Sequence, residues 1–170
     1  VDFDALLEIN PDTIAWIRFD EPSIINYPVV KSADNNEYLT KTFAENDNKL
    51  GAIFMDMRNS SDFSDRNTII YGHHLNVSPD MFSRLHLYED EEFCKEHPDF
   101  YIYTPDGKVR TYTVFSAGIV NAAADNYDIE FESDEAFEQY IEICRDSSNY
   151  QVDVEVNAQS QIVSLSTCTG

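Results

Sequence analysis

Two stretches decide how this chain folds: residues 67–74, which read NTIIYGHH, and residues 161–169, which read QIVSLSTCT. Each opens on a run of β-branched and apolar residues, which is typical of a buried strand. Each ends on side chains with reactive chemistry, histidine in the first and cysteine in the second. Because a rigid scaffold often presents its reactive groups at strand ends, we take these two ends as the candidate site.

The first run predicts a strand over 68–71 that stops at Gly72, so that His73 and His74 follow it. The second predicts a strand over 161–167 that delivers Cys168 at its end. A Cys–His pair is a general arrangement for acyl transfer, in which a thiolate attacks a carbonyl and an imidazole protonates the leaving amine. Composition alone leaves plainer readings open: a packed core thiol, turn histidines, or half of a metal site without the HExxH spacing.

The remaining chain predicts short elements of both kinds. Turns or helices are expected in five places: after Asn10-Pro11-Asp12 (carrying Ile14 and Trp16 toward a core), at 35–43, after Ser78-Pro79-Asp80, at 89–96, and in a long helix capped by Ser133. Strands are expected at 27–30 (an edge, because of Pro28), 51–55, 100–104, 109–115, 116–120, and through the alternating Val152, Val154 and Val156. This order predicts one domain over 1–170, mainly β with helical insertions (α+β), with a helical N-terminus and a long helix before the last strand.

The charge balance excludes two classes of partner. The 170 residues hold 11 Lys and Arg against 32 Asp and Glu, a net charge of −21. Nucleic acids and anionic membrane surfaces both require a basic footprint, so neither is expected as a partner. The stretch 125–142 carries eight acids and no Lys or Arg. We expect a solvated face on an insertion, away from the strand ends with His73 and Cys168.

The cysteines, and the absence of long apolar runs, set further expectations. Three widely spaced cysteines, Cys94, Cys144 and Cys168, do not form a disulfide framework or a zinc motif, and Cys94 and Cys144 fit small buried hydrophobes. We expect no metal and no cofactor. No apolar run approaches a membrane span and no signal peptide opens the chain, so any membrane anchor is expected outside these residues.

Several motifs resemble one family, the sortases. Residues 164–168, SLSTC, resemble the sortase signature TLxTC with Ser in place of the leading Thr, and 67–74 resembles the sortase strand that ends in Gly-His. Further matches are similar to class B sortases: NPDTIAWI at 10–17, YPVV at 27–30, NEYL at 36–39, GAIFMD at 51–56 with Arg58-Asn59, DMF at 80–82, and the long helix from Ser133. The order of these motifs covers nearly the whole chain.

The resemblance implies a closed sortase β-barrel and a cysteine transpeptidase on the outer face of a Gram-positive cell. Such enzymes cleave a C-terminal sorting motif of a secreted protein after its Thr and hold the acyl fragment as a thioester. An amine of a peptidoglycan precursor or a pilin lysine then resolves the thioester. Carried over to this chain, Cys168 would be the nucleophile and His73 its acid–base partner, with Ser166, Thr167 and His74 as substrate-binding neighbours.

The family also uses an arginine on a strand after the Cys strand, and no residue here matches that position. The arginines present lie elsewhere in the pattern: Arg18, Arg58, Arg66, Arg84, Arg110 and Arg145. We therefore expect a domain that ends one strand early at Gly170, and impaired activity of the chain as it stands. Two alternatives stay open: a catalytically silent sortase-like module that binds a peptide or the cell wall, and an unrelated cysteine hydrolase in which Asp56, Asn59 or Asp65 orients His73.

Overall fold

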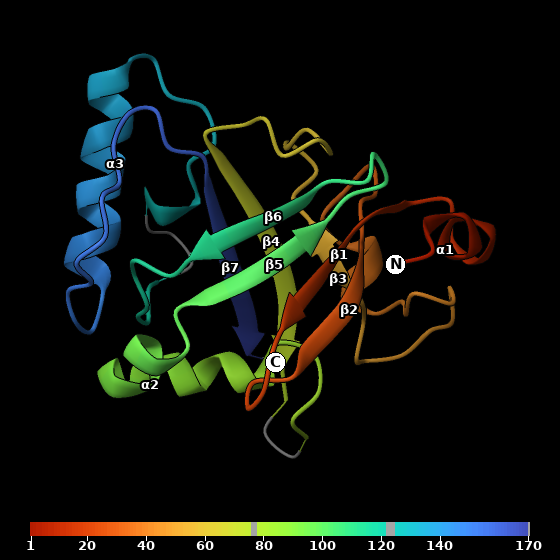
Figure 1. The fold of residues 1–170 in the computed structure, drawn as a ribbon. Coiled ribbons are helices and arrows are strands. Elements are labelled where there is room, and N and C mark those ends of the chain that lie inside the picture. Colours follow the sequence, from red (N-terminus) through yellow and green to blue (C-terminus); the bar gives the residue numbers. More distant parts are fainter. Residues whose placement is uncertain (76–77, 122–124, 170) are drawn as a thin grey trace.

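The computed structural model describes residues 1–75, 78–121 and 125–169. Its seven strands form one curled sheet in the order β6-β5-β1-β2-β3-β4-β7 (Figure 1). Within the described residues β6 and β7 are the two edges, so the sheet is a half-barrel. The strands are β1 Thr13–Phe19, β2 Ile25–Val30, β3 Ile53–Met55, β4 Asn67–His74, β5 Asp99–Tyr103, β6 Val109–Thr113 and β7 Ile162–Thr169. The expected mainly β architecture with helical insertions is confirmed.

Helices are short except for one. They are α1 Phe3–Ile9, η1 Glu37–Leu39, η2 Ser83–Glu89, α2 Glu91–Glu96, η3 Asp125–Tyr127 and α3 Asp134–Ser147, where η marks a 3-10 helix. The long helix α3 precedes β7 as expected, and the Ser133 side chain accepts a hydrogen bond from the Ala136 amide at its N-terminus. Its apolar stripe is buried at Phe137, Tyr140, Ile141 and Cys144. In the described part of the chain, no helix has the length and apolar character needed to cross a membrane.

A turn at residues 11–12 leads directly into β1, so the expected helix there is wrong, and Ile14 and Trp16 lie on a strand. The Asn10 side chain accepts from the Asp12 amide at 2.9 Å, which closes a turn rather than capping a helix. Along β1 burial alternates, with Ala15 and Ile17 fully buried in the core and Ile14 and Trp16 on the half-buried opposite face. Apolar residues on both faces hide the two-residue period of a strand.

Four further expectations fail, two of strands and two of helices. Residues 116–120 and 152–156 form no strand; the carbonyls of Val152 and Val154 accept hydrogen bonds from Arg145 instead. Ser78-Pro79-Asp80 opens a turn in which the Asp80 amide binds the Ser78 hydroxyl, and 3-10 helix begins only at Ser83. The segment 35–43 is helical only in the three residues of η1.

Proline in β2 does not make that strand an edge. β2 lies between β1 and β3, which corrects the expectation of an edge strand at 27–30. Its pairing with β3 is recorded only at Val29 and Val30, while Pro28 pairs with Trp16 on the β1 side. Pro28 therefore stands where the β3 side makes no ladder contact, which is the local equivalent of an edge position.

Gly72 of β4 is packed closely against the core. A Cβ atom there would lie 2.6 Å from Ile53 Cδ1 and 2.7 Å from Phe82 Cδ2. Because both neighbours are buried, we expect Gly72→Ala to lower the free energy of unfolding by about 2 kcal/mol through overpacking. Urea denaturation measures it, and Ile53→Val, which removes the Cδ1 methyl, should recover part of the loss. Equal stability of Gly72→Ala and wild type would contradict the packing described here.

Candidate active site

The backbone register of β4 and β7 brings the two sequence-predicted site residues together. The strands run parallel, and His73 pairs with Cys168. Neighbouring strands lie about 4.8 Å apart, so the two Cα positions are adjacent although the residues are far apart in sequence. In Figure 1 the two strands run side by side and end together near the C-terminus. β4 continues through His74, so the expected stop at Gly72 is wrong: His73 lies inside the strand, in register with its partner.

The His73 ring is oriented by a backbone carbonyl. Its Nε2 lies 2.7 Å from the carbonyl oxygen of Leu39, the last residue of η1. The backbone at this point is fixed as well, because the His73 carbonyl accepts from the Phe82 amide at 3.0 Å. This partner could not be predicted from the sequence, because every residue has the same main-chain carbonyl.

The carboxylate or amide partner that an unrelated cysteine hydrolase needs does not reach His73. Asp56 binds Arg58 and Tyr71, and Asn59 binds the Asn67 carbonyl and the Asp65 carboxylate. The side chains of all three candidates therefore make their hydrogen bonds within the loop between β3 and β4 or to β4. The recorded hydrogen-bond partner of the His73 ring is the Leu39 carbonyl, which removes the support for this alternative.

Two residues before His73 and Cys168, the register pairs Tyr71 with Ser166. The hydroxyl groups of both residues make hydrogen bonds to neighbouring segments. The Ser166 hydroxyl lies 2.9 Å from the hydroxyl of Tyr127 in η3. The Tyr71 hydroxyl donates to Asp56 at 2.7 Å. Tyr127 belongs to the acid-rich stretch 125–142, so the first turn of that stretch lies against β7.

The Asp56 carboxylate accepts hydrogen bonds from both Arg58 and Tyr71. The Asp56 side chain is fully buried and accepts two hydrogen bonds from the Arg58 guanidinium, at 3.0 Å each. Burial acts to raise the pKa of Asp56, but the bonds from Arg58 and Tyr71 outweigh it and lower that pKa to about 2. Burial, and the bond to the Asp56 carboxylate, raise the pKa of the Tyr71 hydroxyl. Arg58 also donates to the Tyr127 carbonyl at 3.1 Å, which ties η3 to the β3–β4 loop.

All six arginines of the chain have partners of their own, and none is recorded beside His73. The partners are Asp20 and Tyr103 for Arg18, Asp56 for Arg58, Asp134 for Arg66, the Pro22 carbonyl for Arg84, Thr104 for Arg110, and the carbonyls of Val152 and Val154 for Arg145.

His74 and Thr167 are the two remaining sequence-predicted site residues, and neighbours along a strand point to opposite faces of the sheet, so His74 faces away from the side of His73. His74 lines a cavity of about 490 Å³ together with Arg84 and His86, and the rings of the two histidines are 6.0 Å apart. Thr167 is exposed on β7 and pairs with Gly72 in the register. Among the described residues, no group of three or more His, Cys, Asp or Glu side chains is arranged to hold a metal ion. Cys94 and Cys144 are buried free thiols, as expected.

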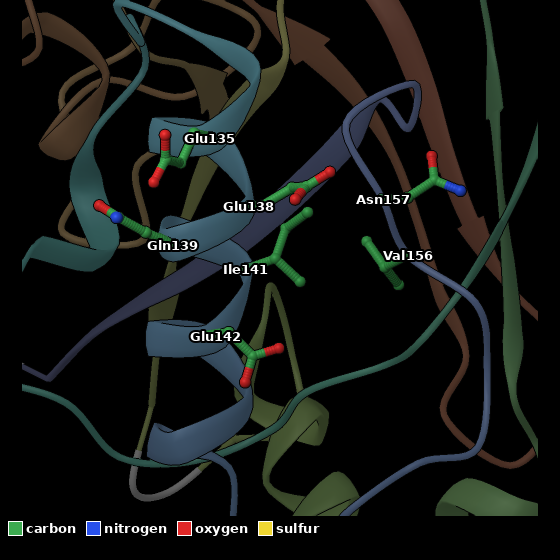
Figure 2. A pocket seen from close by; sticks show the side chains of 7 residues that line it. All are labelled: Glu135, Glu138, Gln139, Ile141, Glu142, Val156 and Asn157. Carbon is green, nitrogen blue, oxygen red and sulfur yellow. The ribbon is translucent and has the colours of Figure 1, made fainter.

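A second cavity lies on α3 and is separate from the candidate site. It has a volume of about 430 Å³ and is lined by Glu135, Glu138, Gln139, Ile141, Glu142, Val156 and Asn157. Figure 2 shows Glu138 and Ile141 on the side of α3 that faces Val156 and Asn157. None of the lining residues belongs to β4 or β7, so most of the acidic stretch does lie on an insertion.

Comparison with known proteins gives consistent matches. The family model for the sortase domain matches residues 20–170. Sortase B of Listeria monocytogenes is 34% identical over 165 residues, and sortase B of Staphylococcus aureus is 35% identical over 167. The matches cover 96% and 98% of this chain but 65% and 67% of those relatives, so the chain spans about two thirds of their length. A solved Staphylococcus aureus sortase B–substrate complex superposes with a TM-score of 0.91 at 32% identity, covering 98% of this chain and 76% of that one.

Proposed function

The chain belongs to the sortase family, and on that premise we propose that it is the catalytic part of a class B cysteine transpeptidase. It would act at the surface of a Gram-positive bacterium on a sorting-motif peptide of secreted proteins. The observation that carries the proposal is the register of β4 and β7, which pairs His73 with Cys168. The same pairing favours a catalytic over a silent sortase-like module, since a module that only binds needs neither group.

The proposed reaction proceeds in two acyl transfers. The Cys168 thiolate attacks the carbonyl carbon of the Thr of the sorting motif, and the electron pair moves onto the carbonyl oxygen. As the carbonyl re-forms, the C–N bond breaks and the His73 imidazolium gives its proton to the leaving amine, which leaves a thioester. An amine of a peptidoglycan precursor or a pilin lysine then attacks the thioester, His73 takes up the amine proton, and the C–S bond breaks.

The substrate would lie along the ends of β4 and β7. We propose Ser166, Thr167 and His74 as residues that contact it, on the grounds that they flank the Cys168–His73 pair in the register. The hydrogen bond between the Ser166 and Tyr127 hydroxyls supports a role for Ser166 in shaping the surface along which the peptide lies. His74 and Thr167 stand on the side of β4 and β7 away from the Leu39 carbonyl, where leaving or accepting groups could be held.

Mass spectrometry of the longest natural form of the protein, mixed with a panel of sorting-motif peptides, tests the proposed function. We expect one peptide to add the mass of its acyl fragment to Cys168, and an added amine such as triglycine to discharge that adduct as an amide product. Peptide cleavage without any adduct at Cys168, or no reaction with every peptide of the panel, would overturn the assignment.

A further inference from the structure

The His73 ring makes a hydrogen bond that defines which of its nitrogens is protonated. Its Nε2 lies 2.7 Å from the Leu39 carbonyl oxygen. A carbonyl oxygen can only accept, so Nε2 must carry the hydrogen. In the neutral ring this leaves the lone pair on Nδ1. The Leu39 carbonyl thereby decides which ring atom is available to exchange a proton, as an orienting carboxylate does in other catalytic sites.

The Leu39 carbonyl belongs to η1, a helix too short to be stable without contacts to the rest of the fold. η1 has three residues, Glu37–Leu39, and its geometry depends on what surrounds it. The Tyr38 side chain is 1% exposed, and its hydroxyl donates to the Asp12 carboxylate at 2.6 Å and accepts from the Asn10 amide at 3.0 Å. The Tyr38 carbonyl accepts from the Ala52 amide at 2.9 Å. The residue before Leu39 is therefore fixed through both its side chain and its backbone.

Gly51 lies just before β3 and packs against the carbonyl groups of Tyr38 and Leu39. Its φ of +62° lies in the left-handed region that favours glycine. A Cβ atom at Gly51 would lie 2.4 Å from the Tyr38 carbonyl oxygen and 2.7 Å from the Leu39 carbonyl oxygen. The second oxygen is the one that binds His73. Any side chain at position 51 must therefore displace the group that orients the imidazole.

We propose that Tyr38, Asp12 and Gly51 are positioning residues for His73, acting through the Leu39 carbonyl. Together they hold that oxygen on Nε2, keep the neutral ring in the Nε2–H form, and leave Nδ1 as the atom that exchanges protons during acyl transfer. The catalytic consequence rests on the proposed function, whereas the tautomer itself is a property of the chain without substrate. The recorded hydrogen bond of the His73 ring goes to the Leu39 carbonyl and not to Tyr38 or Asp12.

The first experiment measures the tautomer by long-range ¹H–¹⁵N NMR of ¹⁵N-histidine-labelled protein at a pH where the ring is neutral. The chain has four histidines, and His73→Gln assigns the signals of His73. We expect the wild type to show a protonated Nε2 and an unprotonated Nδ1. Gly51→Ala should shift His73 toward a mixture of tautomers, while the signals of the other histidines stay in place. Tyr38→Phe, which keeps the buried ring and removes the hydroxyl, should give a smaller shift in the same direction.

Gly107→Ala is the matched control. Gly107 also has a positive φ, +86°, but no heavy atom lies within 4 Å of a Cβ atom built there. Gly107→Ala therefore introduces the same unfavourable backbone conformation for alanine, but its Cβ atom meets no neighbouring atom. In the peptide assay we expect Gly51→Ala to lower the rate of thioester formation about tenfold or more, mainly in kcat, and Gly107→Ala to leave it near wild type.

The outcomes separate this proposal from the proposed function. An Nδ1-protonated His73 in the wild type, or equal spectra and rates for Gly51→Ala and Gly107→Ala, overturns the positioning role. If Gly51→Ala does not fold, Tyr38→Phe decides: an unchanged His73 tautomer pattern and an unchanged rate overturn it. If no form of the protein makes a thioester, the proposed function fails, and the NMR result still decides whether the Leu39 carbonyl sets the tautomer.

Discussion

Cys168→Ala should abolish the acyl adduct, and His73→Ala should lower the rate of its formation by about a thousandfold. The alanine at 168 removes the only atom that can form the thioester, so no covalent intermediate is expected at any enzyme concentration. Loss of His73 removes the proton donor for the leaving amine, an effect that is typically worth a factor of about 10² to 10⁴. Intact-protein mass spectrometry with a reactive sorting peptide measures both changes.

His97→Ala is the control for these two variants. His97 follows the last residue of α2, and its ring packs against Phe93 rather than against β4 or β7. We expect its adduct yield and rate to match the wild type. A Cys168→Ala protein that still cleaves the sorting peptide would show that another group is the nucleophile, and a His73→Ala protein with the wild-type rate would remove His73 from the mechanism.

Asp56→Asn should produce the second largest effect, a loss of about 2 to 3 kcal/mol in the free energy of unfolding at neutral pH. The substitution leaves the guanidinium of Arg58 without its bidentate carboxylate and the Tyr71 hydroxyl with a weaker acceptor, in a site where Asp56 itself is fully buried. Because Arg58 is half exposed, water offsets part of the cost. Urea denaturation of the two proteins measures the difference.

The pH dependence of this difference follows from the lowered pKa of Asp56. Its folded pKa of about 2 lies below the value of about 3.9 for an unfolded aspartate, so the ionised group stabilises the fold. That stabilisation, about 2 kcal/mol, is complete above about pH 5 and is lost as the pH falls toward 2. The gap in unfolding free energy between wild type and Asp56→Asn should therefore shrink by about 1 kcal/mol between pH 7 and pH 3.

Asp106→Asn provides the comparison for Asp56→Asn. Asp106 is an exposed aspartate in the turn between β5 and β6, where it accepts hydrogen bonds from Thr104 and the Lys108 amide. The chemical change is identical, but the group is hydrated in both states, so we expect a much smaller loss of stability. A gap between wild type and Asp56→Asn that does not change between pH 7 and pH 3 would contradict the role given to the Asp56–Arg58 pair.

Elements whose signals are local can be predicted from the sequence alone. The cap at Ser133 and the apolar stripe behind it predicted α3, and the turn at 105–107 predicted the β5–β6 hairpin. The β-branched runs before His73 and Cys168 predicted β4 and β7, and the order of the motifs pointed to the family. These signals are written in residues close together in the chain, so a single sequence is enough to carry them.

How these parts meet is visible only in the folded structure. It set the β4–β7 register that pairs His73 with Cys168, the burial of Asp56 beside Arg58, and the Leu39 carbonyl as the partner of the His73 ring. Strands were expected at 116–120 and 152–156, but neither segment forms one. A local sequence pattern does not show whether a second strand is available to pair with it. The physical reason is common to all of these: register, desolvation and main-chain hydrogen bonds depend on groups distant in sequence, and a carbonyl oxygen is the same atom in every residue.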